Sequence, residues 1–130
     1  MTPFPHSIAP TASLEEAQAM MRLHRIRHLP VCVDHGVIGI LSERDTRVAL
    51  GVDALGEPIS VGQVCTRTPY LVPLDAALDA VADDMAARQI GSALVMRGDK
   101  LAGILTTTDV CRLLGRLLRE HYDSDDDDAA

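Results

Sequence analysis

The sequence predicts an α/β (α+β) fold of two related repeats, each a strand–helix–strand–strand–helix unit, packed sheet to sheet about a pseudo-twofold axis. Three observations carry this prediction. The chain has 130 residues, which suits one compact domain or two small halves with a shared core. Hydrophobic residues make up 47% of it, which is enough to bury a core. Residues 1–50 align with residues 65–114, at an offset of 64 positions and without a gap.

The duplication rests on twelve identical pairs among the fifty aligned positions, against roughly one in twelve expected by chance. These pairs are Thr2/Thr66, Pro5/Pro69, Ala12/Ala76, Leu14/Leu78, Met21/Met85, Ile26/Ile90, Val31/Val95, Gly39/Gly103, Ile40/Ile104, Leu41/Leu105, Asp45/Asp109 and Leu50/Leu114. A unit of about 60 residues buries too little surface to be stable alone. The two repeats are therefore expected to pack on each other and to leave symmetric clefts, which are common ligand sites.

Each repeat opens with an extended segment and continues into a helix. In the first repeat, Ser13 and Glu16 have the spacing of a capping box, which marks a helix start. Leu14, Ala17 and Met21 then recur at helical spacing, and the second repeat shows the same apolar spacing. The pattern predicts one helix at the same place in both repeats.

Two short strands follow each of these helices. In the first repeat they are expected at 29–33 and 37–41, joined by the turn residues 34–36. In the second repeat they are expected at 93–96 and 101–105. A second helix then begins after each strand pair.

The repeats and their flanks have predicted boundaries. The first repeat spans 1–50, a connector rich in Gly and Pro spans 51–63, and the second repeat spans 64–118. Residues 119–130 form an acidic tail that is expected to be disordered. Residues 61–64 are expected to form a strand before the second repeat that has no counterpart before the first, which would leave one cleft more open.

Composition argues against several function classes. The net charge is −7, and an acidic chain with 2% aromatic residues lacks both the basic face and the stacking platforms that bind nucleic acids. The apolar runs are far shorter than the ~20 residues of a membrane span, and the first residues do not resemble a secretory signal. The three cysteines have no Cys-x-x-Cys spacing. We therefore expect a cytoplasmic protein with no membrane segment and no disulfide scaffold.

Three motifs point to a known family. The first, Ile26-Arg27-His28-Leu29-Pro30-Val31, leads into a strand. The other two, at 39–45 and 103–109, share the pattern of Gly, two aliphatic residues, Ser or Thr, two free positions and Asp. On these motifs, residues 1–118 resemble a tandem pair of cystathionine-beta-synthase (CBS) domains, known as a Bateman module.

The resemblance implies a stand-alone regulatory module that binds an adenosine-containing ligand, such as AMP, ADP, ATP, NAD or S-adenosylmethionine, between its repeats. It implies that Asp45 and Asp109 hold the ribose hydroxyls, and that Ser42 and Thr106 lie beside the ribose and phosphate. A carboxylate can accept hydrogen bonds from two vicinal hydroxyls, and a helix start offers N–H groups to an anion. Both effects would converge where each strand meets its helix.

Another interpretation of these residues needs no ligand. Ser-x-x-Asp and Thr-x-x-Asp are also helix-start capping sequences, in which the side chains satisfy backbone N–H groups that the helix leaves unpaired. Capping and ligand binding can coexist in the same residues, so the sequence leaves both open.

Contacts to the rest of such a ligand are expected from both repeats. The candidates for the phosphate are Arg27, His28, Arg44 and Thr108. The alternative for the basic residues is a solvated face balanced by glutamates. Because aromatic residues are scarce, adenine is expected to lie between aliphatic side chains, with the candidates Ile8, Leu29, Ile40, Val72 and Ile104.

The remaining signals concern metals, catalysis and partners. His24 and His28 lie four residues apart but have no third ligand nearby, so we expect no metal site. No nucleophile elbow or P-loop occurs, so we expect no enzyme and no obligatory cofactor. The last helix has a wide leucine stripe, and the resemblance implies a homodimer. The alternative function is a ligand-free module that dimerises or docks on an enzyme or transporter.

Overall fold

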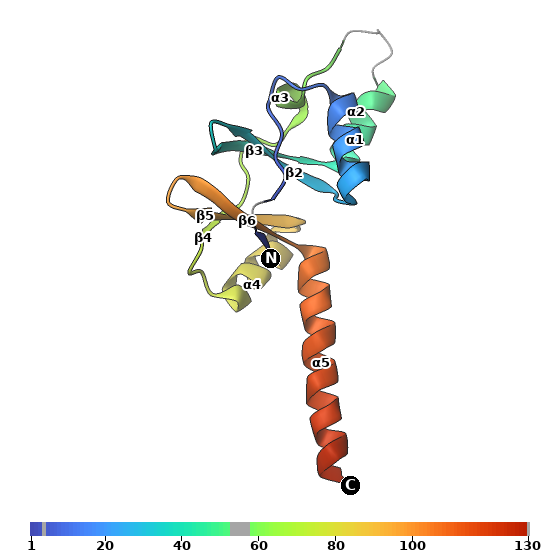
Figure 1. The fold of residues 1–130 in the computed structure, drawn as a ribbon, viewed down its shortest axis with the longest axis vertical. Coiled ribbons are helices and arrows are strands. Elements are labelled where there is room, and N and C mark those ends of the chain that lie inside the picture. Colours follow the sequence, from blue (N-terminus) through green and yellow to red (C-terminus); the bar gives the residue numbers. More distant parts are fainter. Residues whose placement is uncertain (4, 53–57, 130) are drawn as a thin grey trace.

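The structure, a computed structural model, describes residues 1–3, 5–52 and 58–129. It contains two units, each with its own sheet (Figure 1). The first part of the chain forms β1 (Thr2–Pro3), α1 (Leu14–His24), β2 (His28–Val33), β3 (Gly36–Ser42), α2 (Glu43–Val52) and α3 (Val61–Val64). The second part forms β4 (Leu71–Pro73), α4 (Leu78–Arg88), β5 (Ser92–Arg97), β6 (Lys100–Thr106) and α5 (Thr107–Ala129). The predicted fold class of two mixed α/β repeats is confirmed.

The helices and hairpins of the two repeats begin and end as the duplicated sequence indicates. The Ser13 hydroxyl accepts a hydrogen bond from the backbone N–H of Glu16 at 3.1 Å, so α1 starts with the predicted cap. Both α1 and α4 end on a residue in the left-handed region, Arg25 with φ 55° and Gln89 with φ 54°. The predicted first strand of repeat 1 is reduced to a single parallel bridge, Ile8 to Val31. Its counterpart in repeat 2 is β4, which pairs in parallel with β5.

The two repeats exchange their leading segments. Strand β1 pairs with β6 of the second repeat, so that Thr2 lies opposite Ile104. Thr66 in turn pairs with Ile40 of the first repeat, through hydrogen bonds of 2.9 and 3.0 Å between their backbones. Replacing each residue of one contact by its counterpart 64 positions away in the other repeat gives the second contact. A pseudo-twofold relation between the repeats requires this. Strands β3 and β6 contact each other across this interface.

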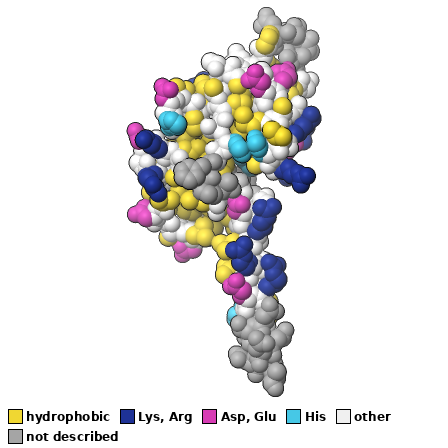
Figure 2. All heavy atoms as spheres, in the orientation of Figure 1, with side chains coloured by type: hydrophobic (Ala, Val, Ile, Leu, Met, Phe, Trp, Pro, Cys, Tyr) yellow, Lys and Arg dark blue, Asp and Glu magenta, His cyan; other side chains and the backbone are white. Residues whose placement is uncertain are grey.

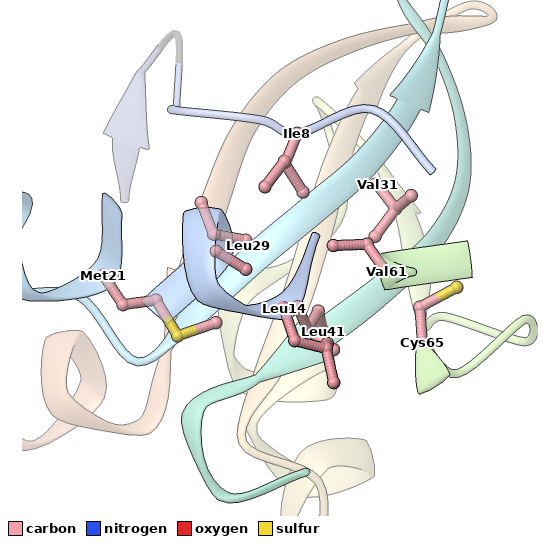
Figure 3. Packing of buried hydrophobic residues seen from close by; sticks show 9 residues of the cluster. Ile8, Leu14, Met21, Leu29, Val31, Leu41, Val61 and Cys65 are labelled. Carbon is pink, nitrogen blue, oxygen red and sulfur yellow. The ribbon is translucent and has the colours of Figure 1, made fainter. Parts of the chain in front are cut away.

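The core of repeat 1 gathers around its small sheet. Leu14, Leu29, Val31 and Leu41 are fully buried there, and Figure 3 shows their side chains converging with that of Val61. Repeat 2 has a smaller cluster of buried residues. Its members are Val72, Val81, Met85, Ala93, Val95 and Leu105.

The structure corrects the prediction of a strand at residues 61–64. They form the short helix α3, in which the Ser60 N–H donates to the Gln63 side-chain oxygen at 2.9 Å and the Cys65 N–H donates to the Val61 carbonyl at 2.9 Å. These local bonds compete successfully with pairing to a sheet. Val61 is fully buried in the core of repeat 1, so α3 packs on the repeat that precedes it. Of the predicted connector, residues 51–52 belong to α2, and residues 53–57 lie outside the described residues.

The acidic tail belongs to the last helix as far as residue 129. Helix α5 continues as far as Ala129, and Figure 1 shows it projecting away from both sheets; Ala130 lies outside the described residues. No proline or glycine follows Gly115, so nothing in this segment breaks a helix. Within the described residues, no helix combines the length and the apolar character that crossing a membrane demands.

Gly39 is expected to be essential for the contact between repeats. A Cβ atom at this position would lie 2.6 Å from the Thr66 carbonyl oxygen and 2.9 Å from the Cys65 sulfur. We therefore expect Gly39→Ala to lower the free energy of unfolding by about 1–3 kcal/mol, as measured by urea denaturation. Gly51→Ala is the matched control, because a Cβ there meets nothing within 4 Å and alanine favours the helix. Equal destabilisation by both substitutions would contradict this assignment.

Candidate functional site

The two strand-to-helix junctions hold Ser42 with Asp45 and Thr106 with Asp109. The Ser42 hydroxyl accepts a hydrogen bond from the Asp45 N–H at 3.0 Å. The Thr106 hydroxyl accepts one from the Asp109 N–H at 3.2 Å, and the Asp109 carboxylate accepts one from the Thr106 N–H at 2.9 Å. Both pairs therefore cap the helices that they begin, as the ligand-free interpretation predicts.

A hollow lies beside each of these helix caps. The first, the Asp109 cleft, has a volume of about 460 Å³. It is lined by Pro5, His6, Arg25, Ile26, Arg27, His28, Ile104, Thr106, Thr107, Thr108, Asp109 and Arg112. The second, the Asp45 cleft, has a volume of about 230 Å³. It is lined by His28, Ile40, Ser42, Asp45, Thr66, Thr68, Pro69, Tyr70, Ile90, Gly91 and Ser92.

The two clefts are built from equivalent positions. The pairs 5/69, 6/70, 26/90, 27/91, 28/92, 40/104, 42/106 and 45/109 each place one member in one cleft and the other in its partner. Each cleft combines the leading segment and the residues before the middle strand of one repeat with the glycine strand and helix start of the other. A ligand in either cleft would therefore touch both repeats.

Their side chains make the clefts chemically different. The Asp109 cleft contains Arg25, Arg27 and Arg112 as well as His28. In the Asp45 cleft, Gly91 and Ser92 stand where the other cleft has Arg27 and His28, and no arginine lines it. The Arg27 guanidinium lies 3.8 Å from the Glu43 carboxylate in an exposed, solvent-screened pair that holds it only weakly. The Asp109 cleft is thus the more cationic and the larger of the two.

The structure brings many of the predicted site residues together. Arg27, His28 and Thr108 line one cleft with Thr106, Asp109 and Ile104. Ile40 lines the other cleft with Ser42 and Asp45. Pairing the basic stretch of repeat 1 with the helix start of repeat 2 is a result of the fold, since sequence alone does not say which repeat completes which cleft.

Four predicted site residues lie elsewhere. Leu29 is fully buried in the core of repeat 1, and Ile8 is almost fully buried in the same core; Figure 3 shows both side chains among the other core residues. Arg44 is exposed on α2 and lines neither cleft. Val72 lines a different hollow that shares Asp109 with the Asp109 cleft.

Sequence reasoning missed the two rings that line the clefts. His6 stacks on His24 with ring centroids 3.5 Å apart and an interplanar angle of 13°. At the equivalent positions, the Arg88 guanidinium lies 4.7 Å from the centre of the Tyr70 ring. The signal was present in the aligned dipeptides Pro5-His6 and Pro69-Tyr70, whose second members both carry a planar ring. Each cleft therefore has a ring as well as aliphatic side chains in its lining.

His24 and His28 do not combine in a metal site. The His24 ring faces His6, while His28 lines both clefts. Among the residues that the structure describes, no three His, Cys, Asp or Glu side chains gather closely enough to hold a metal ion.

His28 lies between the two clefts and is sensitive to both. Its pKa is lowered from 6.5 by burial and by the nearby Arg27 charge, while the Asp45 carboxylate acts in the opposite direction. Its ring also packs against Gly91, where a Cβ would lie 2.9 Å from the imidazole Nε2. Gly91, in place of the arginine found in repeat 1, therefore makes room for this histidine.

Comparison with known proteins gives the same assignment as the motifs. The profile of the CBS domain matches residues 1–51 and 61–116. L-aspartate semialdehyde sulfurtransferase from Methanocaldococcus jannaschii is 30% identical over 105 residues, which cover 79% of this chain and 20% of that protein. The chain thus corresponds to about a fifth of that enzyme.

Two solved structures have the same fold. A proposed acetoin utilization protein (AcuB) from Vibrio cholerae is 29% identical, with a TM-score of 0.83 over 95% of this chain and 92% of that chain. The CBS domain pair of protein MJ0100, solved in complex with 5′-methylthioadenosine and S-adenosyl-L-methionine, is 28% identical. Its TM-score is 0.74, over 85% of this chain and 89% of that chain.

The position of His28 predicts how its titration responds to its neighbours. We expect an NMR titration to give a pKa below 6.5, lowered further in Asp45→Asn and raised in Arg27→Gln. Because the folded-state pKa lies below the unfolded value, the neutral imidazole stabilises the fold above pH 6.5. That contribution is lost as the pH falls from 6.5 through the folded-state pKa. The same pKa in wild type and both variants would contradict the placement of His28 between these charges.

Proposed function

This chain belongs to the CBS domain family, and we propose that it is a regulatory module that senses an adenosine-containing ligand in the clefts between its repeats. The observation that carries the proposal is the Asp109 cleft, where a helix-start carboxylate, a ring and several cationic side chains from both repeats surround one hollow. The candidates are AMP, ADP, ATP, NAD and S-adenosylmethionine.

The ribose end of the ligand is assigned to Asp109. Its carboxylate gives one oxygen to the Thr106 N–H, which holds the group at the start of α5 and leaves its remaining acceptor sites to vicinal hydroxyls. The dipole of α5 adds a partial positive charge at the same place. Capping and binding therefore support each other in this residue.

The phosphate end is assigned to the arginines of the same cleft. Arg25 and Arg27 come from repeat 1 and Arg112 from α5 of repeat 2, so an anion there would be shared between the repeats. The neutral His28 imidazole adds a hydrogen-bonding group beside them. The cleft volume of about 460 Å³ falls in the range of about 300–1,000 Å³ that small-molecule sites occupy. The smaller Asp45 cleft, without arginine, suits a related ligand that carries less negative charge.

Relatives support the ligand class. The ligands of the MJ0100 domain pair are both adenosine derivatives, and that pair is 28% identical to this chain. The sulfurtransferase from M. jannaschii matches over only 20% of its length, so its catalytic activity does not transfer with the match. We propose a binding role without catalysis. The ligand would regulate a partner by binding one arrangement of the repeats more tightly than another.

Thermal shift measurements test this proposal. AMP, ATP, NAD and S-adenosylmethionine at millimolar concentration are the probes, and a binder raises the Tm by mass action. We expect AMP to raise the Tm, and Asp109→Asn to weaken its binding about tenfold, since the amide keeps the helix cap but loses the charge-assisted bonds. The exposed turn variant Asp99→Asn is the control and should keep the AMP effect. No shift with any of the four compounds would overturn the sensor and favour the ligand-free interaction module.

The sensor is further proposed to be a homodimer. Helix α5 exposes Leu114, Leu117, Leu118 and Tyr122, each between 45% and 62% accessible, on the part that projects from the body. Side chains at this spacing share one helix face, and a long helix with an exposed apolar stripe is stabilised by packing against a partner.

Sedimentation velocity tests the dimer. We expect the wild type to sediment with twice the mass of one chain, and Leu117→Arg to shift it to the monomer because a charge would be buried at the contact. Leu23→Arg, at an exposed leucine of α1, is the control that should leave the dimer intact. A monomeric wild type would contradict the proposal, and so would dissociation by Leu23→Arg alone.

A further inference from the structure

The two repeats differ in how one side of their core is closed. In repeat 1, α3 covers the core, and Val61 packs with Leu14, Val31 and Leu41. The equivalent positions in repeat 2 surround a hollow of about 370 Å³. This groove is lined by Met1, Val72, Pro73, Leu74, Ala76, Leu78, Val81, Val95, Leu105, Asp109, Arg112, Leu113 and Arg116.

The leucines that begin α1 and α4 show how differently the two cores are covered. Leu14 and Leu78 are the same residue at the same position of equivalent helices. Leu14 is 0% exposed, whereas Leu78 is 45% exposed. Covering the exposed part of Leu78 with an apolar segment would therefore be favourable.

Backbone groups make the groove more than an apolar surface. In repeat 1, the Val61 and Gly62 N–H groups donate to the carbonyls of Ala12 and Pro10, each at 2.9 Å. The Leu14 N–H donates to the Ile59 carbonyl at 3.3 Å. The equivalent groups in repeat 2 are the carbonyls of Ala76 and Leu74 and the N–H of Leu78. None of these three groups has a backbone partner in the part of the chain that the structure describes.

The segment that fills the groove of repeat 1 also defines the side chains that fit. Val61 is the buried anchor, and the next residue must be small, since a Cβ on Gly62 would lie 3.1 Å from the Cβ and carbonyl oxygen of Pro10. A valine followed by glycine, with a further apolar residue on each side, is the pattern of residues 59–64.

The rim of the groove in repeat 2 has its own charge. Arg112 and Arg116 line it at the positions that Val48 and Val52 occupy in repeat 1, and neither arginine forms an ion pair within the described residues. Figure 2 shows Lys and Arg side chains gathered where α5 leaves the body. An occupant with acidic residues beside its apolar core would complement this rim.

We propose that the groove of repeat 2 docks a short apolar segment of a partner polypeptide, flanked by acidic residues, in the way that α3 docks on repeat 1. The segment would place a valine among Val72, Val81 and Leu105 and pair its backbone with Leu74, Ala76 and Leu78. This surface goes beyond ligand sensing and does not depend on it. Asp109 and Arg112 line both the groove and the Asp109 cleft, so if the proposed sensor also holds, ligand and partner contact the same two side chains.

Methyl NMR of the full chain, without nucleotide, tests the docking. The probe is a blocked peptide Asp-Asp-Ile-Ser-Val-Gly-Gln-Val, which joins two aspartates to the sequence of residues 59–64. We expect saturable shifts of the methyl groups of Val72, Val81, Val95 and Leu105. A peptide with two lysines in place of the aspartates should bind several-fold more weakly, and one with valine in place of its glycine should not bind.

Substitutions in the chain locate the binding. Leu78→Ala, at the exposed rim, should weaken peptide binding several-fold, since it removes apolar contact and leaves the charge of the groove unchanged. Leu23→Ala on α1 is the matched control and should bind the peptide like the wild type. Absence of saturable shifts, shifts confined to the core of repeat 1, or equal binding of the aspartate and lysine peptides would each overturn the proposal. None of these results decides whether the chain binds nucleotides, so the docking proposal and the sensor proposal can fail independently.

Discussion

The mutual exchange of leading segments is the contact on which the rest of this structure depends. Thr66 and Ile40 pair through two backbone hydrogen bonds, and this approach is close because Gly39 has no side chain to separate the strands. The equivalent pairing of Thr2 with Ile104 ties the repeats together a second time. Each repeat is too small to be stable alone, so the exchange supports both cores and holds the two halves in one relation.

That relation produces the clefts. Because each leading segment crosses to the other repeat, the residues before the middle strand of one repeat come to face the helix start of the other. The backbone frame of the two clefts is therefore the same, while their chemistry is set by the few positions at which the repeats have diverged. Arg27 against Gly91 is the clearest case, since it adds a cation to one cleft, whereas no arginine lines the other.

The same symmetric frame contains the open groove. The same helix start, strand and carbonyl groups occur in both repeats, yet α3 covers them only in repeat 1. The hollow in repeat 2 adjoins the more cationic cleft, since Asp109 and Arg112 line both.

The sequence predicted those features of the fold that depend on interactions between residues close together in the chain. The offset of 64 positions, the Ser13 cap and the alternation of helix and strand specify the duplicated architecture, because caps and apolar periodicity act between residues close in the chain. The helix starts directly after Ser42 and Thr106 were predictable for the same reason. The prediction of a strand at 61–64 was wrong, since a tetrapeptide is too short to show a hydrophobic periodicity. Its conformation depended on packing against the core of repeat 1.

Tertiary structure alone decided which residues share a cleft. The sequence could not assign Arg27 to the helix start of the other repeat, place Leu29 in the core rather than in a ligand pocket, or bring His6 and Tyr70 to the cleft walls. Each of these depends on contacts between residues tens of positions apart, and such contacts follow from how the leading segments cross and not from any local pattern. The duplication predicted that two clefts would exist; the crossing of the chain determined what lines them.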